Sequence, residues 1–214
     1  MGGKWNRKAK AHIFDIEASD AVDQILTTGE VVTNRDKLRE FGFFQTPQAI
    51  VDLVIERAEI GDGMLVMEPS AGYGAIAEAA ICAAESVMLD MYEIQKENCD
   101  VLEKKFEKRS FWGLAEPVNF LDVDPNPVYD RIVMNPPFAK LADIDHVLHA
   151  FKFLKPGGRL VAIMGAGFSF RNDSKCLSFR NFLIGHGADV SSLPDGSFRE
   201  SGTGVATKLV VLDK

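Results

Sequence analysis

The chain has few cysteines and no long hydrophobic run. Its 214 residues include three cysteines, Cys82, Cys99 and Cys176, which are odd in number and far apart. This spacing argues against a disulfide framework and against a paired metal-ligand motif, and it indicates reduced thiols in a cytoplasmic protein. No apolar run approaches the roughly 20 residues of a membrane span. A secretory signal would require an apolar run after its basic N-terminal residues, and the basic residues of this chain are not followed by one. We therefore expect neither export nor a membrane partner.

The sequence also lacks an excess of positive charge. Its 31 acidic residues outnumber the 24 lysines and arginines, which gives a formal net charge of -7. Contacts to phosphates supply most non-specific affinity for nucleic acid, so this balance disfavours tight autonomous DNA binding. A local basic face remains compatible with it. The length fits one domain with a small extension.

Short apolar runs alternate with helical patterns from about residue 41 onward. Strands are expected at 64–67, 87–92, 118–121, 131–134, 159–164, 188–192 and 205–212. Helices are expected at 47–58, 75–84, 96–108, 141–154 and 175–184, the first of them capped by Thr46 and the turn 156–158 leading into the fifth strand. This alternation predicts an α/β fold with a mostly parallel seven-stranded sheet, helices on both faces and an antiparallel edge hairpin.

The first 40 residues are weakly patterned. An apolar face at 20–26 indicates one short helix there. We therefore expect a partly helical N-terminal extension at 1–40 and one catalytic domain at 41–214.

A glycine-rich turn follows the first expected strand and opens a helix. It has the sequence Glu-Pro-Ser-Ala-Gly-Tyr-Gly at 68–74. Glycines let backbone amides approach a ligand closely at a helix N-terminus. The acidic Glu68 would repel a pyrophosphate but suits a ligand that carries an ammonium and a sulfonium. The binding residues expected in this turn are Glu68, Ser70, Ala71, Gly72 and Gly74.

Two further acids follow the next two expected strands. Glu93 can accept hydrogen bonds from two ribose hydroxyls, with Ile94 beside it. Asp122 can accept from an adenine amino group, with Val123 or Leu121 against the ring. A nucleoside site without phosphates, next to an amino-acid site, fits S-adenosylmethionine. We expect S-adenosylhomocysteine as the product and no metal.

The motif Asn135-Pro136-Pro137-Phe138 ends the fourth expected strand. The prolines favour an extended backbone and have no N–H to cover nearby acceptors. The Asn135 side-chain oxygen and the Pro136 carbonyl can then each accept one hydrogen of an exocyclic NH2 group. Such acceptors stabilise the positive charge that grows on nitrogen as it attacks a methyl group. Phe138 can stack on the substrate ring, and a base in a duplex must first be flipped out.

These motifs together resemble a class I S-adenosylmethionine-dependent methyltransferase of the N6-adenine DNA type, with a Rossmann-like methyltransferase fold. The segment 43–47, with Phe44, Thr46 and Pro47, is similar to the motif of that family that closes over the methionine part of the cofactor. The resemblance therefore adds these three residues, and Asn135, to the cofactor site. The segment 198–204 is similar to a part of the family near the target base. The likeness covers about residues 41 to 214.

The chain departs from the family in one respect. Nothing between 41 and 214 is left to build a separate target-recognition region, so a partner recognition subunit is one expectation. The Asn-Pro-Pro-aromatic motif also suits the guanine N2 amino group of ribosomal RNA or a glutamine amide in a release factor. A cofactor-binding subunit of a larger assembly is a further alternative. The target sequence, the biological role and the oligomeric state do not follow from the sequence.

Several polar residues outside these motifs have weaker patterns. His146 and His149 share a helix face without an evident third metal ligand, so a solvated face is expected. The lysines Lys104 and Lys105 are interleaved with glutamates and are expected to be solvated too. The candidates for phosphate contacts are Arg171, Lys175, Arg180 and Arg199.

Overall fold

The computed structural model describes residues 4–6, 11–13, 45–107, 117–199 and 205–214. The chain divides into two compact units, Met1–Phe43 and Phe44–Lys214. In the first unit, β1 (Lys4–Asn6) pairs antiparallel with β2 (Ala11–Ile13). The helix expected at 20–26 and the cofactor-site residue Phe44 lie outside the described residues. The domain boundary expected after residue 40 lies there too and stays a prediction.

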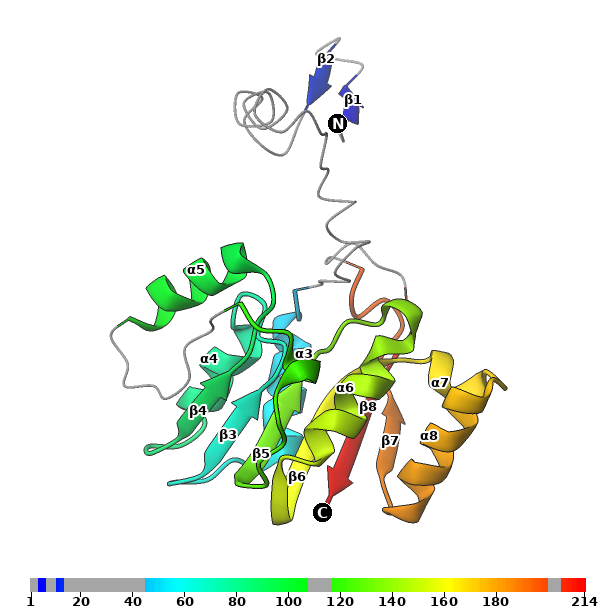
Figure 1. The fold of residues 1–214 in the computed structure, drawn as a ribbon. Coiled ribbons are helices and arrows are strands. Elements are labelled where there is room, and N and C mark those ends of the chain that lie inside the picture. Colours follow the sequence, from blue (N-terminus) through cyan, green and yellow to red (C-terminus); the bar gives the residue numbers. More distant parts are fainter. Residues whose placement is uncertain (1–3, 7–10, 14–44, 108–116, 200–204) are drawn as a thin grey trace. The chain divides into compact units, whose positions relative to one another are not determined.

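The described part of the second unit contains one six-stranded sheet with the order β4-β3-β5-β6-β8-β7 (Figure 1). Its strands are β3 (Leu65–Glu68), β4 (Met88–Met91), β5 (Tyr129–Met134), β6 (Leu154–Gly165), β7 (Asp189–Ser192) and β8 (Thr207–Asp213). Strands β4, β3, β5 and β6 run parallel, whereas β8 is antiparallel to both β6 and β7. The mostly parallel sheet and its antiparallel edge are confirmed.

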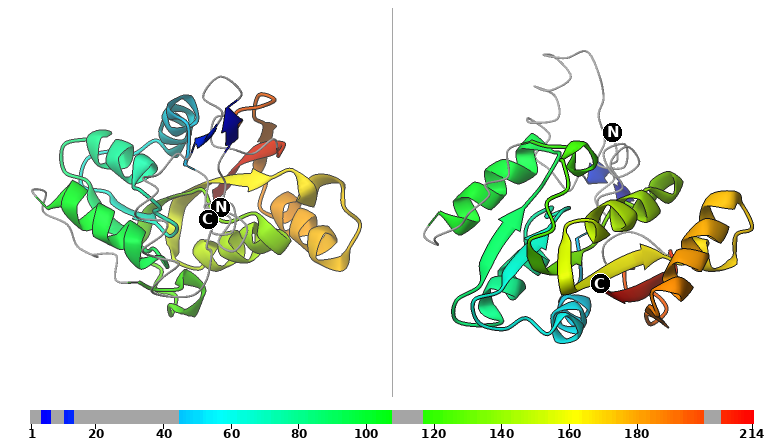
Figure 2. Two further views of the ribbon diagram at one scale, coloured as in Figure 1. Left: turned by 90° about the horizontal axis from the view of Figure 1, so that it is seen from above. Right: turned by 60° about the horizontal axis from the view of Figure 1, so that its bottom comes forward.

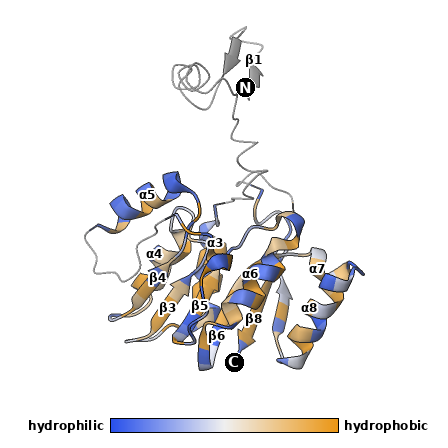
Figure 3. Ribbon diagram, in the orientation of Figure 1, coloured by the Kyte–Doolittle hydropathy of each residue, from blue (hydrophilic) through white to orange (hydrophobic). Residues whose placement is uncertain are grey.

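Helices cover both faces of this sheet (Figure 2). They are α3 (Gln48–Ala58), α4 (Ala75–Cys82), α5 (Lys96–Phe106), α6 (Ala142–Phe151), α7 (Gly167–Phe170) and α8 (Ser174–Gly185). Figure 3 shows hydrophobic residues concentrated along the strands and hydrophilic ones along the outer side of α5. None of the described helices is long and apolar enough to cross a membrane.

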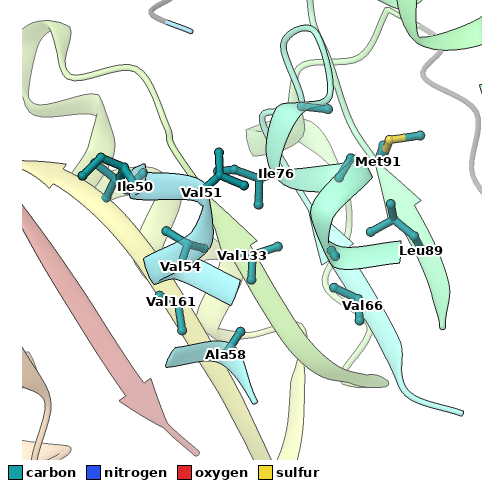
Figure 4. Packing of buried hydrophobic residues seen from close by; sticks show 14 of the residues in the cluster. Ile50, Val51, Val54, Ala58, Val66, Ile76, Leu89, Met91, Val133 and Val161 are labelled. Carbon is teal, nitrogen blue, oxygen red and sulfur yellow. The ribbon is translucent and has the colours of Figure 1, made fainter. Parts of the chain in front are cut away.

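Alternating residues of β3, β5, β6 and β8 supply two separate cores. Val66 and Val133 pack with α3, α4 and α5, whereas Met67 and Ile132 pack on the opposite face with α6 and α8. Helix α3 contributes its apolar face to the first core (Figure 4). The period of two follows from the pleat of a strand. Each fully buried aliphatic side chain contributes about 1.5–3 kcal/mol to stability, so the two cores fix the strand order and register.

The expectation of a strand at 118–121 is wrong. In its place the structure has a short 3-10 helix, η1 (Phe120–Asp122). The Asn119 side chain is the reason, because it accepts a hydrogen bond from the Leu121 amide at 3.3 Å and donates one to Asp122 at 3.0 Å. A side chain that bonds to nearby backbone competes with strand pairing. Only an isolated bridge between Glu93 and Pro117 remains, and the sheet has six described strands instead of seven.

The turn expected at 156–158 lies inside β6, which begins at Leu154 where the preceding helix was expected to end. The register between β5 and β6 shifts here, between Tyr129 and Arg131. A Cβ atom on Gly158 would lie 2.9 Å from the Tyr129 carbonyl oxygen, so only glycine permits this close strand approach. The Pro-Gly-Gly sequence therefore forms an irregularity within the strand.

Candidate functional site

The carboxyl ends of three neighbouring parallel strands carry the residues singled out in the sequence. Strand β3 ends at Glu68, β4 ends two residues before Glu93, and β5 ends directly before Asn135. Strand order places β3 between β4 and β5. Ligands of open α/β sheets bind at this edge. The fold therefore brings the glycine-rich turn, the ribose candidate Glu93 and the reactive motif to one edge.

The glycine-rich turn is fastened to the neighbouring strand end. The Ala71 amide donates to the Tyr92 carbonyl at 2.9 Å, and the Gly72 amide donates to Glu93 Oε2 at 2.8 Å. Gly72 has φ 53° and Gly74 has φ 73°, both in the left-handed region that favours glycine. Gly74 is the N-cap of α4, so the turn leads straight into a helix N-terminus.

Gly74 has no room for a side chain. An added Cβ would lie 2.7 Å from Leu102 Cδ2 and 2.9 Å from Phe106 Cε2, both in the first core. We expect Gly74→Ala to lower the free energy of unfolding by about 1–3 kcal/mol through overpacking and backbone strain. Thermal denaturation measures this, with Gly185→Ala as the matched control because a Cβ there meets nothing within 4 Å. Equal melting temperatures for the two variants would contradict the packing described.

Lys105 is not simply solvated, contrary to the expectation for this helix face. Its ammonium donates to the carbonyls of Tyr73 at 3.3 Å and Gly74 at 3.2 Å, and it pairs with Glu78 at 2.7 Å. It thus holds α5 against the glycine-rich turn and the start of α4. No pattern in the sequence indicates this contact, because the partners are backbone carbonyls about 30 residues away.

Glu93 is buried and collects backbone amides around its carboxylate. Besides Gly72 on Oε2, its Oε1 accepts from the amides of Ile94 at 3.0 Å and Gln95 at 2.8 Å. Ile94 itself is 48% exposed. A carboxylate has about four acceptor sites, two on each oxygen, so the two amides fill Oε1 and one site stays open on Oε2. The carboxylate is therefore held rigidly at the strand end, and its Oε2 can still accept a hydroxyl group.

Asp122 and Val123 lie at the end of η1. Asp122 is exposed, and its carboxylate accepts from Asn119 at 3.0 Å. The Val123 carbonyl lies 2.9 Å from His149 Nε2. His149 packs edge-on against Phe120 and Phe153, and His146 is buried. The expected solvated face for the two histidines is therefore wrong, and His149 fixes the loop that carries Asp122.

Glu68 is almost fully buried, and its Oε2 has no hydrogen-bond partner among the described residues. Burial raises the pKa of the Glu68 carboxyl well above its ordinary value, and the negative charge of Glu93 adds to this effect. The Ala77 amide opposes this rise in pKa, but a buried carboxyl oxygen without a partner is costly. Such a group suits a ligand that brings a donor or a positive charge to it.

Thr46 does not cap helix α3, contrary to the expectation. The N-cap of α3 is Pro47, without a side-chain cap bond. The Thr46 hydroxyl instead accepts a hydrogen bond from Asn135 Nδ2 at 3.0 Å, in a partly buried position. This bond holds the Asn135 side chain beside Thr46, with the amide nitrogen towards the hydroxyl. The segment before α3 is thereby tied to the reactive motif.

Phe138 follows two prolines, of which Pro136 is buried. Its half-buried ring meets the buried ring of Phe198 edge-on, with centroids 6.4 Å apart. The structure thus brings the start of the segment expected near the substrate next to the reactive motif. Residues 200–204 of that segment lie outside the described part of the chain.

Three of the four phosphate candidates have partners within the protein. Arg171 pairs with Asp173, Lys175 pairs with Asp145, and Arg180 donates to the carbonyls of Phe168 and Arg171. Arg199 is exposed. In the described ranges, no group of three His, Cys, Asp or Glu side chains could hold a metal ion.

The parallel sheet, its antiparallel edge and a site at the carboxyl strand ends define the class of Rossmann-like methyltransferases. The family model of the methyltransferase small domain matches residues 54–172. The chain belongs to this family. A search of curated protein sequences finds no match.

Solved structures show the same fold at low sequence identity. A modification subunit ascribed to a type I restriction enzyme of Vibrio vulnificus YJ016 has 17% identity and a TM-score of 0.67, over 96% of this chain and 51% of that one. The M protein of the type I restriction enzyme EcoKI has 16% identity and a TM-score of 0.68, over 93% and 51%. TrmN from Thermus thermophilus has 19% identity and a TM-score of 0.55, over 78% and 48%. The chain spans about half the length of these relatives.

Proposed function

We propose that this chain transfers a methyl group from S-adenosylmethionine to an exocyclic amino nitrogen, namely N6 of adenine in DNA. The observation that carries the proposal is the bond from Asn135 Nδ2 to Thr46 Oγ1. With its nitrogen engaged there, the amide presents an oxygen, and an oxygen is what an NH2 donor requires. In the opposite orientation the NH2 group of Asn135 would face the NH2 group of the substrate, and neither could accept a hydrogen bond from the other.

The chemistry of the chain's own residues follows from this orientation. Asn135 Oδ1 and the Pro136 carbonyl each accept one N6 hydrogen, which favours a pyramidal nitrogen and stabilises its developing charge. S-adenosylmethionine supplies an electrophilic methyl group on a sulfonium. Phe138 holds the flipped base by stacking. The nitrogen loses its proton after the attack, so no separate base acts beforehand.

The residues at the other strand ends fit this cofactor. The unpartnered Oε2 of buried Glu68 suits the ammonium of its amino-acid part, and Ser70, Ala71, Gly72 and Gly74 form the turn beside it. Glu93 would accept from the ribose through the open site on Oε2, and Asp122 with Val123 would face the adenine. Thr46 and Pro47 would close the methionine end.

The assignment to DNA rests on Thr46-Pro47 and on the likeness to modification subunits of type I restriction enzymes. A partner subunit would supply target recognition, and three of the four phosphate candidates, Arg171, Lys175 and Arg180, have partners within the protein. Another neighbour is described in the context of complex assembly in a type I system. RNA methyltransferases share the fold as well, so the acceptor must be tested directly.

Cofactor binding is expected to release a proton from Glu68. Burial favours the neutral carboxyl in the free protein, whereas the cofactor's ammonium favours the charged form. The affinity should therefore rise with pH until Glu68 is ionised in the free protein as well. Calorimetric titration in buffers of different ionisation enthalpy should show up to about one proton released, and none for Glu68→Gln. A pH-independent affinity in the wild-type protein would contradict the role given to Glu68.

The acceptor is identified by offering the purified chain unmethylated DNA, ribosomal RNA and a release factor in parallel, with radiolabelled S-adenosylmethionine. We expect label in DNA, and none with Asn135→Ala. Label only in RNA or in the release factor would replace the proposed substrate by one of those alternatives. Cofactor binding without label in any acceptor would favour a binding subunit of a larger assembly.

A further inference from the structure

Asp143 is a buried carboxylate that the proposed reaction has not yet used. It lies near the start of α6, five residues after Phe138, and is 1% exposed. Its Oδ2 accepts from the Gly165 amide at 3.0 Å and its Oδ1 accepts from the Ile144 amide at 3.1 Å. Gly165 is the last residue of β6. The carboxylate therefore joins the beginning of α6 to the carboxyl end of the neighbouring strand.

The backbone between the reactive motif and Asp143 is strained. Lys140 has φ 54° and Leu141 has φ 60°, and both are side-chain-bearing residues in the left-handed region. Such conformations persist only where the surroundings hold them. Within this segment Phe138 lies against Gly165, where an added Cβ would be 3.5 Å from Phe138 Cβ. Asp143 binds the amide of that same glycine.

Stability alone does not account for a carboxylate at this position. Burial raises the pKa of Asp143 to about 6, although the Gly165 and Ile144 amides and the charge of Lys175 on α8 oppose this. The folded state thus favours the neutral form, so the stability that Asp143 contributes is present at low pH and is lost as the pH rises towards 6. The other titratable groups near it on α6 are Asp145, which pairs with Lys175, and His146.

We propose that Asp143 is a positioning residue for methyl transfer: its carboxylate fastens the segment 138–141 to the end of β6 and so fixes the Phe138 ring. This inference rests on the proposed function, in which Phe138 receives the substrate ring. When Asp143 is ionised, both its oxygens accept from backbone amides. Asp143→Asn keeps the shape but turns an NH2 group towards one of these amides, so one of the two bonds is lost.

The test compares Asp143→Asn with Asp145→Asn, which alters an exposed carboxylate on the same helix. Amide hydrogen exchange is followed in peptides that cover 138–145 and 160–168, corrected for the intrinsic rate. We expect about tenfold faster exchange in both peptides of Asp143→Asn, because the segment opens locally, and no change in Asp145→Asn. Unchanged exchange in Asp143→Asn would overturn the proposal, whatever substrate the enzyme has.

The second readout is catalytic. For Asp143→Asn, kcat should fall about 10- to 100-fold through misplacement of Phe138, while the Kd of S-adenosylmethionine stays within about twofold. The wild-type kcat should decline below a pH of about 6, because Asp143 becomes protonated there. The kcat of Asp143→Asn should not show this decline. Parallel losses of kcat, cofactor affinity and melting temperature would indicate a merely structural role. If the wild-type protein were inactive, the proposed function would be refuted. The hydrogen-exchange result would still decide whether Asp143 fastens the segment 138–141 to the end of β6.

Discussion

Asn135→Ala should reduce the rate of methyl transfer by about 10²- to 10³-fold, the usual effect of removing one preorganised polar group from a transition state. The substitution deletes the acceptor oxygen that Thr46 orients through Asn135 Nδ2. Single-turnover transfer from radiolabelled S-adenosylmethionine to unmethylated DNA measures this rate. The Kd of the cofactor should change much less, because the proposed loss concerns the developing charge on the acceptor nitrogen.

Thr46 offers a matched pair of controls for this interpretation. Thr46→Ser keeps the hydroxyl and should retain most of the activity. Thr46→Val keeps the shape but removes the acceptor for Asn135 Nδ2, which frees the amide to rotate, so a fall in kcat of about tenfold is expected. Equal activity of Thr46→Val and Thr46→Ser would show that the hydroxyl does not orient Asn135. Full activity of Asn135→Ala would remove the mechanism altogether.

Glu93→Ala should weaken the binding of S-adenosylmethionine by about 100-fold, since hydrogen bonds to a charged group contribute about 1.5–3 kcal/mol. Two losses combine in this variant. The ribose hydroxyls lose their acceptor, and the Gly72, Ile94 and Gln95 amides lose the carboxylate that orders them. Isothermal titration calorimetry on the purified chain measures the Kd.

Asp100 provides the control for Glu93. It lies on α5, and its carboxylate pairs with exposed Lys96 at 2.6 Å. Asp100→Ala removes the same charge near the same helix and should change the Kd by less than about twofold, since exposed pairs contribute little. If Glu93→Ala bound the cofactor as tightly as Asp100→Ala, the site would have to lie elsewhere.

Local patterns predict most of the sheet because strand and helix periods differ so clearly in this chain. The apolar run at 131–134 becomes the end of β5, and the apolar spacing at 47–58 becomes α3. The expected strand at 118–121 is missing, because hydrophobic periodicity alone does not determine the structure of this segment. Here the Asn119 side chain bonds to residues two and three positions later, and these bonds favour the 3-10 helix over a strand. Hydrophobic periodicity contains no information about such bonds.

The placement of residues that follow strand ends is predictable from the sequence, whereas contacts that cross the fold are not. Glu68, Glu93 and Asn135 lie at one edge as expected, because parallel strands place their carboxyl ends there. Lys105 and Asp143 could not, because their partners are backbone groups of distant turns. The position of Thr46 directly before Pro47 predicts a helix cap, whereas its partner in the fold is a side chain 89 residues away.

The identity of the methylated atom decides whether this chain methylates N6 of adenine through Asn135. Unmethylated DNA is incubated with the chain and S-adenosylmethionine carrying a deuterated methyl group, then digested to nucleosides and analysed by mass spectrometry. We expect deuterated N6-methyl-deoxyadenosine with the wild-type chain and none with Asn135→Ala. Label on a ring carbon or an oxygen, or N6 label that persists in Asn135→Ala, would contradict this expectation.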